Sequence, residues 1–168
     1  RLSLVGSEMC IRDRFKPLPS VTRKPGQIIA TASADAPLKG LPVLLHAFKR
    51  LVEAEPERQL VLIARPKAGG DTEALIERLG LFDQIRFVGG ASHEDINRLY
   101  AESAVAVVPS LYEGFGLPAV EAMAAGIPLV SSDGGALAEV VADGGLVVPA
   151  GDSDALAETL ERVLTDPT

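Results

Sequence analysis

Short apolar runs alternate with longer amphipathic segments along most of the chain. The run AVAVVP at residues 104–109 has no charged or strongly polar position, which is typical of a strand covered on both faces of a parallel sheet. The segment 41–54 instead places Leu41, Leu45 and Phe48 along one stripe of a helix. The pattern predicts strands at residues 27–33, 59–64, 85–88, 104–109, 128–132 and 146–148.

The predicted helices occupy the segments between these strands. Ser92 and Asp95 have the spacing of a capping box, with Asp in place of the usual Glu, and predict a helix that ends at Glu102. Pro118 suits the first position of a helix, because an N–H group there would have no intrahelical acceptor. The other predicted helices are residues 41–54, 71–79, 136–142 and 154–164.

Strands that alternate with helices predict an α/β fold with right-handed crossovers. We therefore expect a Rossmann-like, doubly wound parallel sheet of about six strands with helices on both faces. In such sheets, ligands bind beyond the carboxyl ends of the strands. Five candidate residues directly follow predicted strands and should converge on that edge: Lys39, Arg65, Gly89, Glu113 and Asp133.

The composition restricts the class of protein. The chain has 168 residues, of which 47% are hydrophobic and 23% charged, enough for one core in one domain. A net charge of −7 argues against nonspecific nucleic-acid binding, and the apolar runs are too short to span a membrane. Cys10 is the only cysteine, and His46 and His93 lack the spacing of metal ligands, so we expect no metal.

Residues 113–130, EGFGLPAVEAMAAGIPLV, say most about function, because they form a predicted strand-loop-helix unit. Gly114 and Gly116 permit positive φ angles and a close approach of the backbone to a ligand. The N–H groups of residues 115–119, except Pro118, should gather at the start of the helix. Their partial positive charge suits a phosphate group.

Two carboxylates and one lysine surround this predicted anion site. Glu113 lies at the loop entrance, Glu121 lies one turn into the helix, and Lys39 follows the first strand in a Pro-Leu-Lys-Gly turn. Each residue also has an ordinary alternative without a ligand. Glu113 could simply belong to a turn, Glu121 could be a solvated residue of the helix surface, and Lys39 could be an exposed loop lysine. We expect Asp133, in the sequence DGG, to form a turn rather than to bind a ligand.

Five segments, in order, resemble the donor-binding signature of retaining glycosyltransferase family four, whose members have the GT-B fold. The matches together span roughly residues 27–164, nearly all of the informative chain. The segments are PLKGLPVLLHA at 37–47, IRFVG at 85–89, EGFGLPAVEAMAAGIPLV at 113–130, SDGGALAE at 132–139 and VVPAGDSDAL at 147–156.

The resemblance implies a role for each matched residue. Glu113 would lie beside the transferred sugar and Glu121 would bind the ribose hydroxyls, while Lys39 would neutralise the diphosphate. Lys39 and Glu113 are therefore the candidate catalytic residues. The substrate would be a nucleoside-diphosphate sugar, with UDP or GDP as the favoured nucleotide, and neither a cofactor nor a metal is implied. The candidate substrate-binding residues are Gly40, Val88, Gly89, Ser110, Gly114, Phe115, Gly116, Leu117 and Glu121.

One departure from the family pattern affects the diphosphate site. Many members have an arginine about five positions before the lysine, where this chain has Ala34 and Asp35. Neither can replace a guanidinium that binds two phosphate oxygens. Arg65, which follows the second predicted strand, is a candidate for the missing charge.

The N-terminal residues differ in character from the rest of the chain. Residues 4–13, LVGSEMCIRD, resemble one translated frame of a sequencing-library adapter, so we expect residues 1–14 to be a disordered artefact. Residues 15–25 have the composition of a linker, and residues 26–168 form the predicted nucleotide-sugar domain. The resemblance then implies a domain truncated at both ends that lacks an N-terminal acceptor domain. The whole enzyme would be cytoplasmic, with peripheral membrane association as an option.

Three other functions stay open at this point. Gly114, Gly116 and Ala119 also fit G-x-G-x-x-A after a strand, and Asp133 ends the next strand, as in an NAD or FAD domain of an oxidoreductase. Against it, that fingerprint normally occupies the first strand-helix unit, whereas three strands precede this one. A sugar-nucleotide epimerase with the GT-B fold is a second alternative. The third is a binding module, because the isolated chain should bind nucleotide without transferring a sugar.

Overall fold

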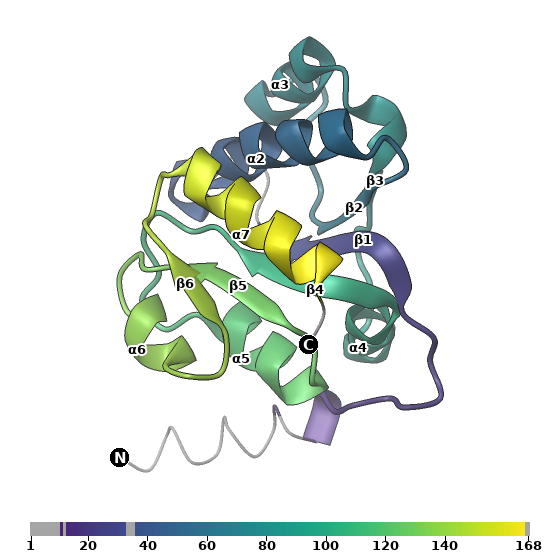
Figure 1. Ribbon diagram of the computed structural model, residues 1–168, viewed down its shortest axis with the longest axis vertical. Helices are drawn as coiled ribbons and strands as arrows, with labels where there is room; N and C mark the ends of the chain where they lie inside the picture. Colours follow the sequence, from purple (N-terminus) through teal and green to yellow (C-terminus); the bar gives the residue numbers. More distant parts are fainter. Residues whose placement is uncertain (1–10, 12, 33–35, 167–168) are drawn as a thin grey trace.

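The computed structural model describes residues 11, 13–32 and 36–166. The described residues contain one sheet of six parallel strands in the order β3-β2-β1-β4-β5-β6 (Figure 1). This arrangement confirms the predicted doubly wound α/β fold. The strands are β1 (Lys24–Thr31), β2 (Gln59–Ile63), β3 (Ile85–Phe87), β4 (Ser103–Val108), β5 (Leu129–Ser132) and β6 (Leu146–Val148).

The strand order reverses beside β1, and this reversal positions the candidate site. The chain builds outward from β1 through β2 to β3, then crosses back to place β4 on the other side of β1. Ile29 of β1 therefore pairs with Val61 of β2 on one side and with Ala106 of β4 on the other. The loops that leave the carboxyl ends of β1 and β4 diverge to opposite faces there, which leaves room for a ligand between them.

Helices cover both faces of the sheet (Figure 1). On one face, α2, α3 and α7 pack against strand residues such as Ile28, Leu60 and Val107. On the other face, α4, α5 and α6 pack against Ile29 and Ala106. The helical elements are η1 (Pro37–Lys39), α2 (Leu41–Ala54), α3 (Asp71–Leu79), η2 (Phe82–Gln84), α4 (His93–Glu102), α5 (Leu117–Ala125), α6 (Leu137–Val141) and α7 (Ser153–Thr165).

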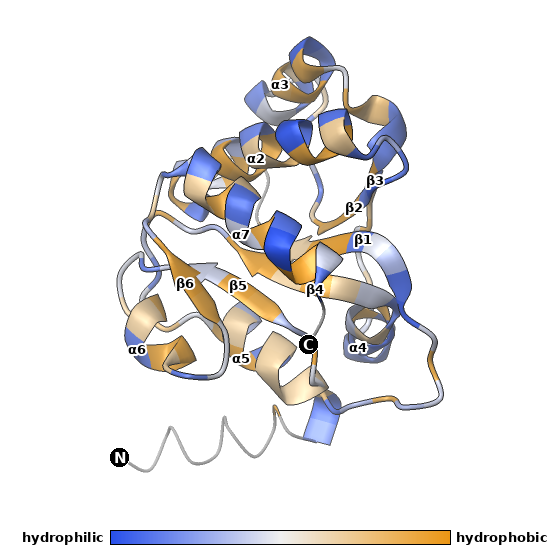
Figure 2. Ribbon diagram, viewed as in Figure 1, coloured by the Kyte–Doolittle hydropathy of each residue, from blue (hydrophilic) through white to orange (hydrophobic). Residues whose placement is uncertain are grey.

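The hydropathy of each element follows this layering. Figure 2 shows hydrophobic strands at the centre, and helices that combine hydrophobic and hydrophilic residues around them. In α2, the buried positions recur every three or four residues, as a helix with one face on the core requires. In α4, the predicted capping box is confirmed: Ser92 Oγ accepts from the Asp95 N–H, and the Asp95 carboxylate accepts from the Ser92 N–H, both at 3.1 Å.

Two features of the N-terminal part differ from the sequence pattern. β1 begins at Lys24, three residues before the predicted strand, and its pairing with β4 is irregular between Lys24 and Ile28. Pro25 and Gly26 lie inside this irregularity, because a proline has no N–H group for a regular ladder. Phe15, which precedes the strand, is buried and packs edge-to-face on Tyr100 with ring centroids 6.0 Å apart.

Residues 1–10 and 12, which carry most of the segment predicted to be an artefact, lie outside the described residues. Ile11 packs at the edge of the core that contains Phe15. In the described part of the chain, no helix is long and apolar enough to cross a membrane.

Candidate functional site

The loop between β4 and α5 holds Glu113 near the carboxyl ends of the central strands. Its carboxylate is largely buried, and Oε2 accepts a hydrogen bond from Ser110 Oγ at 3.2 Å. Ser110 follows β4 and is itself buried. The backbone carbonyl of Glu113 accepts from the Ala136 N–H at 2.9 Å. Both the side chain and the backbone of Glu113 are therefore held by neighbouring groups.

The turn after β1 brings Lys39 to the same place. Gly40 ends η1 with a φ of 64°, and a Cβ atom built there would lie 1.9 Å from the Pro109 carbonyl oxygen. The turn can pack this closely on the end of β4 only because residue 40 is glycine. The Leu38 carbonyl also accepts from the Leu111 N–H at 2.8 Å, which joins the two loops directly.

Lys39 and Glu113 form an ion pair across the point where the sheet reverses. Lys39 Nζ lies 2.8 Å from Glu113 Oε2, and the two residues are 74 positions apart in the sequence. The side chains of Lys39 and Glu113 are 32% and 15% exposed, so solvent reaches the ammonium more than the carboxylate. The site thus places a positive and a negative charge side by side at the carboxyl ends of β1 and β4.

The first turn of α5 supplies unpaired donors beside this ion pair. Gly116 caps the helix with a φ of 83° and is buried. Among the residues that the structure describes, no acceptor bonds the N–H groups of Phe115, Gly116 and Leu117. The prediction that Ala119 joins them is wrong, because its N–H donates to the Gly116 carbonyl at 3.0 Å. Three amides remain for an anion at this helix end.

Glu121 lies half-buried on α5, and burial raises the pKa of its carboxyl group. In the described ranges no hydrogen-bond donor contacts its carboxylate. Burial raises the pKa of the nearby Tyr100 phenol and the charge of Glu121 adds to the rise, whereas a hydrogen bond to Thr31 Oγ1 opposes it. Glu121 is therefore partly desolvated on the side of α5 that faces Tyr100.

The predicted nucleobase edge lies beyond β3. The backbone of Val88 continues the β2–β3 ladder, since its N–H donates to the Leu62 carbonyl at 2.8 Å. The side chain of Arg65 lies over the next two residues, and Cβ atoms built at Gly89 and Gly90 would come within 2.6 Å of it. Arg65 thus follows β2, the neighbour of β1, but its side chain lies at the end of β3, two strands from β1 in the sheet order.

Of the remaining candidates, Gly114 and Leu117 are exposed and Phe115 is half-buried. A Cβ atom built at Gly114 would meet no atom within 4 Å, so close packing does not require a glycine at this position. Ala34 and Asp35, which stand where many family members have an arginine, lie outside the described residues.

The turn after β5 lies at the predicted edge of the sheet, and its contacts with the loop that carries Glu113 were not predicted. Ser132 Oγ donates a hydrogen bond to the Ser110 carbonyl, and Cβ atoms built at Gly134 would clash with the Ser110 and Leu111 carbonyls. Asp133, expected to form a turn, accepts from the Ala150 N–H at 2.7 Å. The segment SDGG was recognised as part of the family pattern, but its contacts join residues 22 positions apart, which no local pattern reveals.

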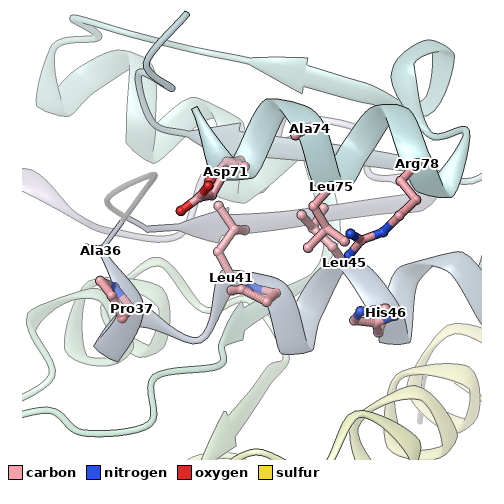
Figure 3. A pocket seen from close by; sticks show the side chains of 11 residues that line it. Ala36, Pro37, Leu41, Leu45, His46, Asp71, Ala74, Leu75 and Arg78 are labelled. Atoms are coloured by element: carbon pink, nitrogen blue, oxygen red, sulfur yellow. The ribbon is translucent and has the colours of Figure 1, made fainter. Parts of the chain in front are cut away.

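A separate pocket of about 440 Å³ opens between α2 and α3 (Figure 3). Its walls are largely apolar, with Leu41, Leu45 and Leu75, and the polar groups of His46 and Arg78 border it. It contains none of the candidate site residues. No group of three or more His, Cys, Asp or Glu side chains in the described part of the chain could hold a metal ion.

The fold and the site together define a Rossmann-like α/β domain with a charged site at its topological switch point. Residues 15–168 match the family model of the glycosyl transferases group 1. The chain is 51% identical over 154 residues to the MMP alpha-(1->4)-mannosyltransferase of Mycolicibacterium hassiacum, an alignment that covers 89% of this chain and 37% of that protein.

Two solved structures extend the comparison to three dimensions. The C-terminal domain of the group 1 glycosyl transferase LpcC from Francisella tularensis has a TM-score of 0.77 and 25% identity, and the match covers 93% of this chain and 88% of that domain. Anabaena HepE, solved in complex with UDP and glucose, has a TM-score of 0.76 and 25% identity, covering 93% of this chain and 45% of HepE.

The chain belongs to the group 1 glycosyl transferases, and its fold is the half of a GT-B enzyme that corresponds to the LpcC C-terminal domain. The resemblance found in the sequence is thereby confirmed. The chain spans a little over a third of the length of the mannosyltransferase that it matches. The comparisons give no support to an adapter origin for the first residues, which stays a prediction.

Proposed function

We propose that this chain binds the nucleoside diphosphate of a sugar donor at the switch point between β1 and β4. One observation carries the proposal: the Lys39–Glu113 pair lies beside the start of α5, where three backbone N–H groups lack an acceptor in the described structure. Lysine and helix-terminal amides both bind phosphate, so the diphosphate would take its place between them. Glu121 would accept hydrogen bonds from the ribose, and the base would lie against Val88 and Gly89.

The same groups account for a role in sugar transfer. When the bond between the anomeric carbon and the diphosphate breaks, negative charge builds on the leaving phosphate. Lys39 and the amides of Phe115, Gly116 and Leu117 would stabilise this charge, which is the electrostatic contribution that usually dominates. Glu113 is proposed to position the sugar, since its carboxylate lies beside Lys39 and is fixed by Ser110. Retention of anomeric configuration is part of the proposal on family grounds.

Relatives support the substrate class. HepE was solved with UDP and glucose, and the Mycolicibacterium relative is named a mannosyltransferase. We therefore propose a hexosyltransferase whose donor carries UDP or GDP, acting without a metal or other cofactor. The acceptor would bind to a further N-terminal domain of a longer cytoplasmic enzyme, which could contact a membrane peripherally. Neither HepE nor the Mycolicibacterium relative supports the alternative of a sugar-nucleotide epimerase with the GT-B fold.

The isolated chain should bind the nucleotide but transfer no sugar, because the acceptor domain is not part of it. Incubation with UDP-glucose or GDP-mannose and mixed sugar acceptors, followed by mass spectrometry, should show no glycosylated product. Formation of a product by these 168 residues alone would contradict this division of labour.

Calorimetric titration with UDP, GDP and NAD tests the binding proposal. We expect saturable binding of UDP or GDP and none of NAD, because the candidate glycine loop follows the fourth strand, whereas an NAD fingerprint normally occupies the first strand-helix unit. Lys39→Ala should weaken binding by about tenfold to a hundredfold, the range for a hydrogen bond to a charged group. The control Lys49→Ala removes a lysine of α2 that pairs with Glu53 and should leave the affinity unchanged. Tight binding of NAD, or equal affinities for both variants, would contradict the proposal.

A further inference from the structure

The turn that follows β5 lies under the loop that carries Glu113. Ser132 ends β5 and is 2% exposed, and its hydroxyl donates to the backbone carbonyl of Ser110. Ser110 is 3% exposed, and its own hydroxyl donates to Glu113 Oε2 at 3.2 Å. Two buried hydroxyl groups thus connect β5 to the carboxylate that pairs with Lys39.

Further contacts of the same turn hold the loop backbone. The Ala136 N–H donates to the Glu113 carbonyl at 2.9 Å. Cβ atoms built at Gly134 and Gly135 would lie 2.4 Å from the Ser110 carbonyl oxygen and 2.3 Å from the Glu113 carbonyl oxygen. The two glycines therefore let the turn come into direct contact with the loop, and any displacement of the turn would displace Glu113.

The turn is itself fixed from its other side. The N–H of Asp133 donates to the Val148 carbonyl at 2.9 Å, and its carboxylate accepts from the Ala150 N–H at 2.7 Å. These bonds attach the turn to β6 and to the loop that precedes α7. Ser132 consequently lies between β6 and the loop that carries Glu113.

We propose that Ser132 is a positioning residue for the donor site: through the Ser110 carbonyl, it fixes Ser110 Oγ and thereby the orientation of the Glu113 carboxylate. Ser132 itself does not contact the donor. Without its hydroxyl, the Ser110 carbonyl loses a buried donor, and Ser110 can rotate or shift away from Glu113. The expected weakening of ligand binding rests on the proposed function. The expected loosening of the loop that carries Glu113 does not.

Ser131 offers a matched control in the next position of the same strand. Its side chain is also buried, and its hydroxyl donates to the Ser132 carbonyl at 3.0 Å rather than to the Glu113 loop. Ser131→Ala and Ser132→Ala delete the same atom from neighbouring buried sites of β5. Any effect of Ser132→Ala that Ser131→Ala lacks therefore reports on the two bonds of the Ser132 hydroxyl, to the Ser110 carbonyl and from the Gly134 N–H at 3.4 Å.

The first measurement needs no ligand. Amide hydrogen exchange by NMR on the whole chain should show exchange of the Leu111 and Ala136 amides about threefold to tenfold faster in Ser132→Ala, the range for one lost hydrogen bond, and unchanged in Ser131→Ala. If Ser132→Ala does not fold, Ser132→Cys keeps a side chain of similar size with a weaker donor and should show the same effect in reduced form. Equal exchange in the two serine variants would overturn the proposal.

The second measurement asks whether Ser132 acts through Glu113. Affinities for UDP-glucose and GDP-mannose are measured for wild type, Ser132→Ala, Glu113→Gln and the double variant. Ser132→Ala should weaken binding of the nucleotide sugar that wild type prefers by about threefold to tenfold, and should have no further effect once Glu113 is Gln. Additive effects would overturn the proposal. If wild type binds neither compound, the proposed function fails, and the exchange measurement alone decides the role of Ser132.

Discussion

At the scale of single residues, Glu121 illustrates the free-energy cost of keeping a carboxylate ionised where it is partly shielded from water. Its carboxyl group is half-buried on α5, and in the described structure no donor compensates for the lost water. Burial raises its pKa, which means that the ionised form is disfavoured in the folded chain. Such a residue lowers stability at neutral pH, and the proposed binding of the ribose would use its carboxylate.

Replacing Glu121 should separate stability from function. The folded pKa lies above the ordinary value of 4.5, so the destabilising effect is absent below that value and complete above the folded pKa. Glu121→Gln should therefore melt at a higher temperature than wild type at pH 7, and this advantage should shrink as the pH falls towards 4. The same variant should bind UDP or GDP more weakly, because the ribose loses a charged acceptor.

The control for Glu121 is Glu158, an exposed residue of α7. Glu158→Gln should show neither the pH-dependent gain in melting temperature nor the loss of affinity. A Glu121→Gln variant with unchanged nucleotide affinity would return Glu121 to the ordinary role of a helix surface residue.

At the scale of elements, the turn after β1 depends on one glycine. Gly40 has a φ of 64°, and a Cβ atom built there would lie only 1.9 Å from the Pro109 carbonyl oxygen after β4. Gly40→Ala should destabilise the chain by at least about 2 kcal/mol, because it adds left-handed strain to a clash with the Pro109 carbonyl. Gly114→Ala places a methyl group where no atom lies within 4 Å and should be tolerated. Urea unfolding of both variants checks this, and comparable stabilities would contradict the described packing of the turn.

The last helix is attached to the domain by a second kind of contact. Arg58, whose side chain is 7% exposed, donates through both terminal nitrogens to Glu161 of α7, one of them at 2.9 Å. This hydrogen bond lowers the pKa of Glu161. The stabilisation is therefore present above the ordinary pKa of 4.5 and is lost as the pH falls through the lower folded value.

Glu161→Gln should lower the free energy of unfolding by about 1 kcal/mol at pH 7, less than for a fully buried pair because the Glu161 side chain is 40% exposed. The difference from wild type should decrease at acidic pH. Asp154→Asn removes the charge from the exposed Arg50–Asp154 pair, which joins α2 to α7, and should cost clearly less. Equal losses for the two variants, measured by urea unfolding, would show that burial of Arg58 does not strengthen its ion pair.

The elements themselves were largely predictable from the sequence. The stripe of α2, the Ser92–Asp95 capping box and the apolar run of β4 are local patterns, and each element formed where its pattern lies. The start of β1 was missed because Pro25 and Gly26 resemble a linker, whereas the structure absorbs them in an irregular ladder. Local periodicity contains no information on such tertiary pairing.

The site was predictable in its parts but not in its internal contacts. The order of strands and helices placed Lys39 and Glu113 on one edge, yet their ion pair and the contact of Ser132 with Ser110 join residues distant in sequence. Phe15 is a similar case, because a single aromatic residue in an aperiodic segment gives no sign that it packs on Tyr100. These contacts follow from the packing of loops at the sheet edge, which only the folded chain defines.

At the scale of the whole molecule, the parallel sheet brings the site together. Lys39 follows β1, Glu113 and the α5 amides follow β4, and the supporting turn follows β5. The three neighbouring strands β1, β4 and β5 hold these groups on a rigid frame whose two faces are packed by separate cores. The proposed anion site would therefore be preorganised before any ligand arrives.

The most direct test of the central claim is a crystal structure of the chain soaked with whichever of UDP and GDP it binds. The account predicts diphosphate oxygens within hydrogen-bond distance of Lys39 Nζ and of the Gly116 and Leu117 amides, with the ribose at Glu121. A nucleotide bound instead in the pocket between α2 and α3, with the Lys39–Glu113 pair undisturbed, would contradict it.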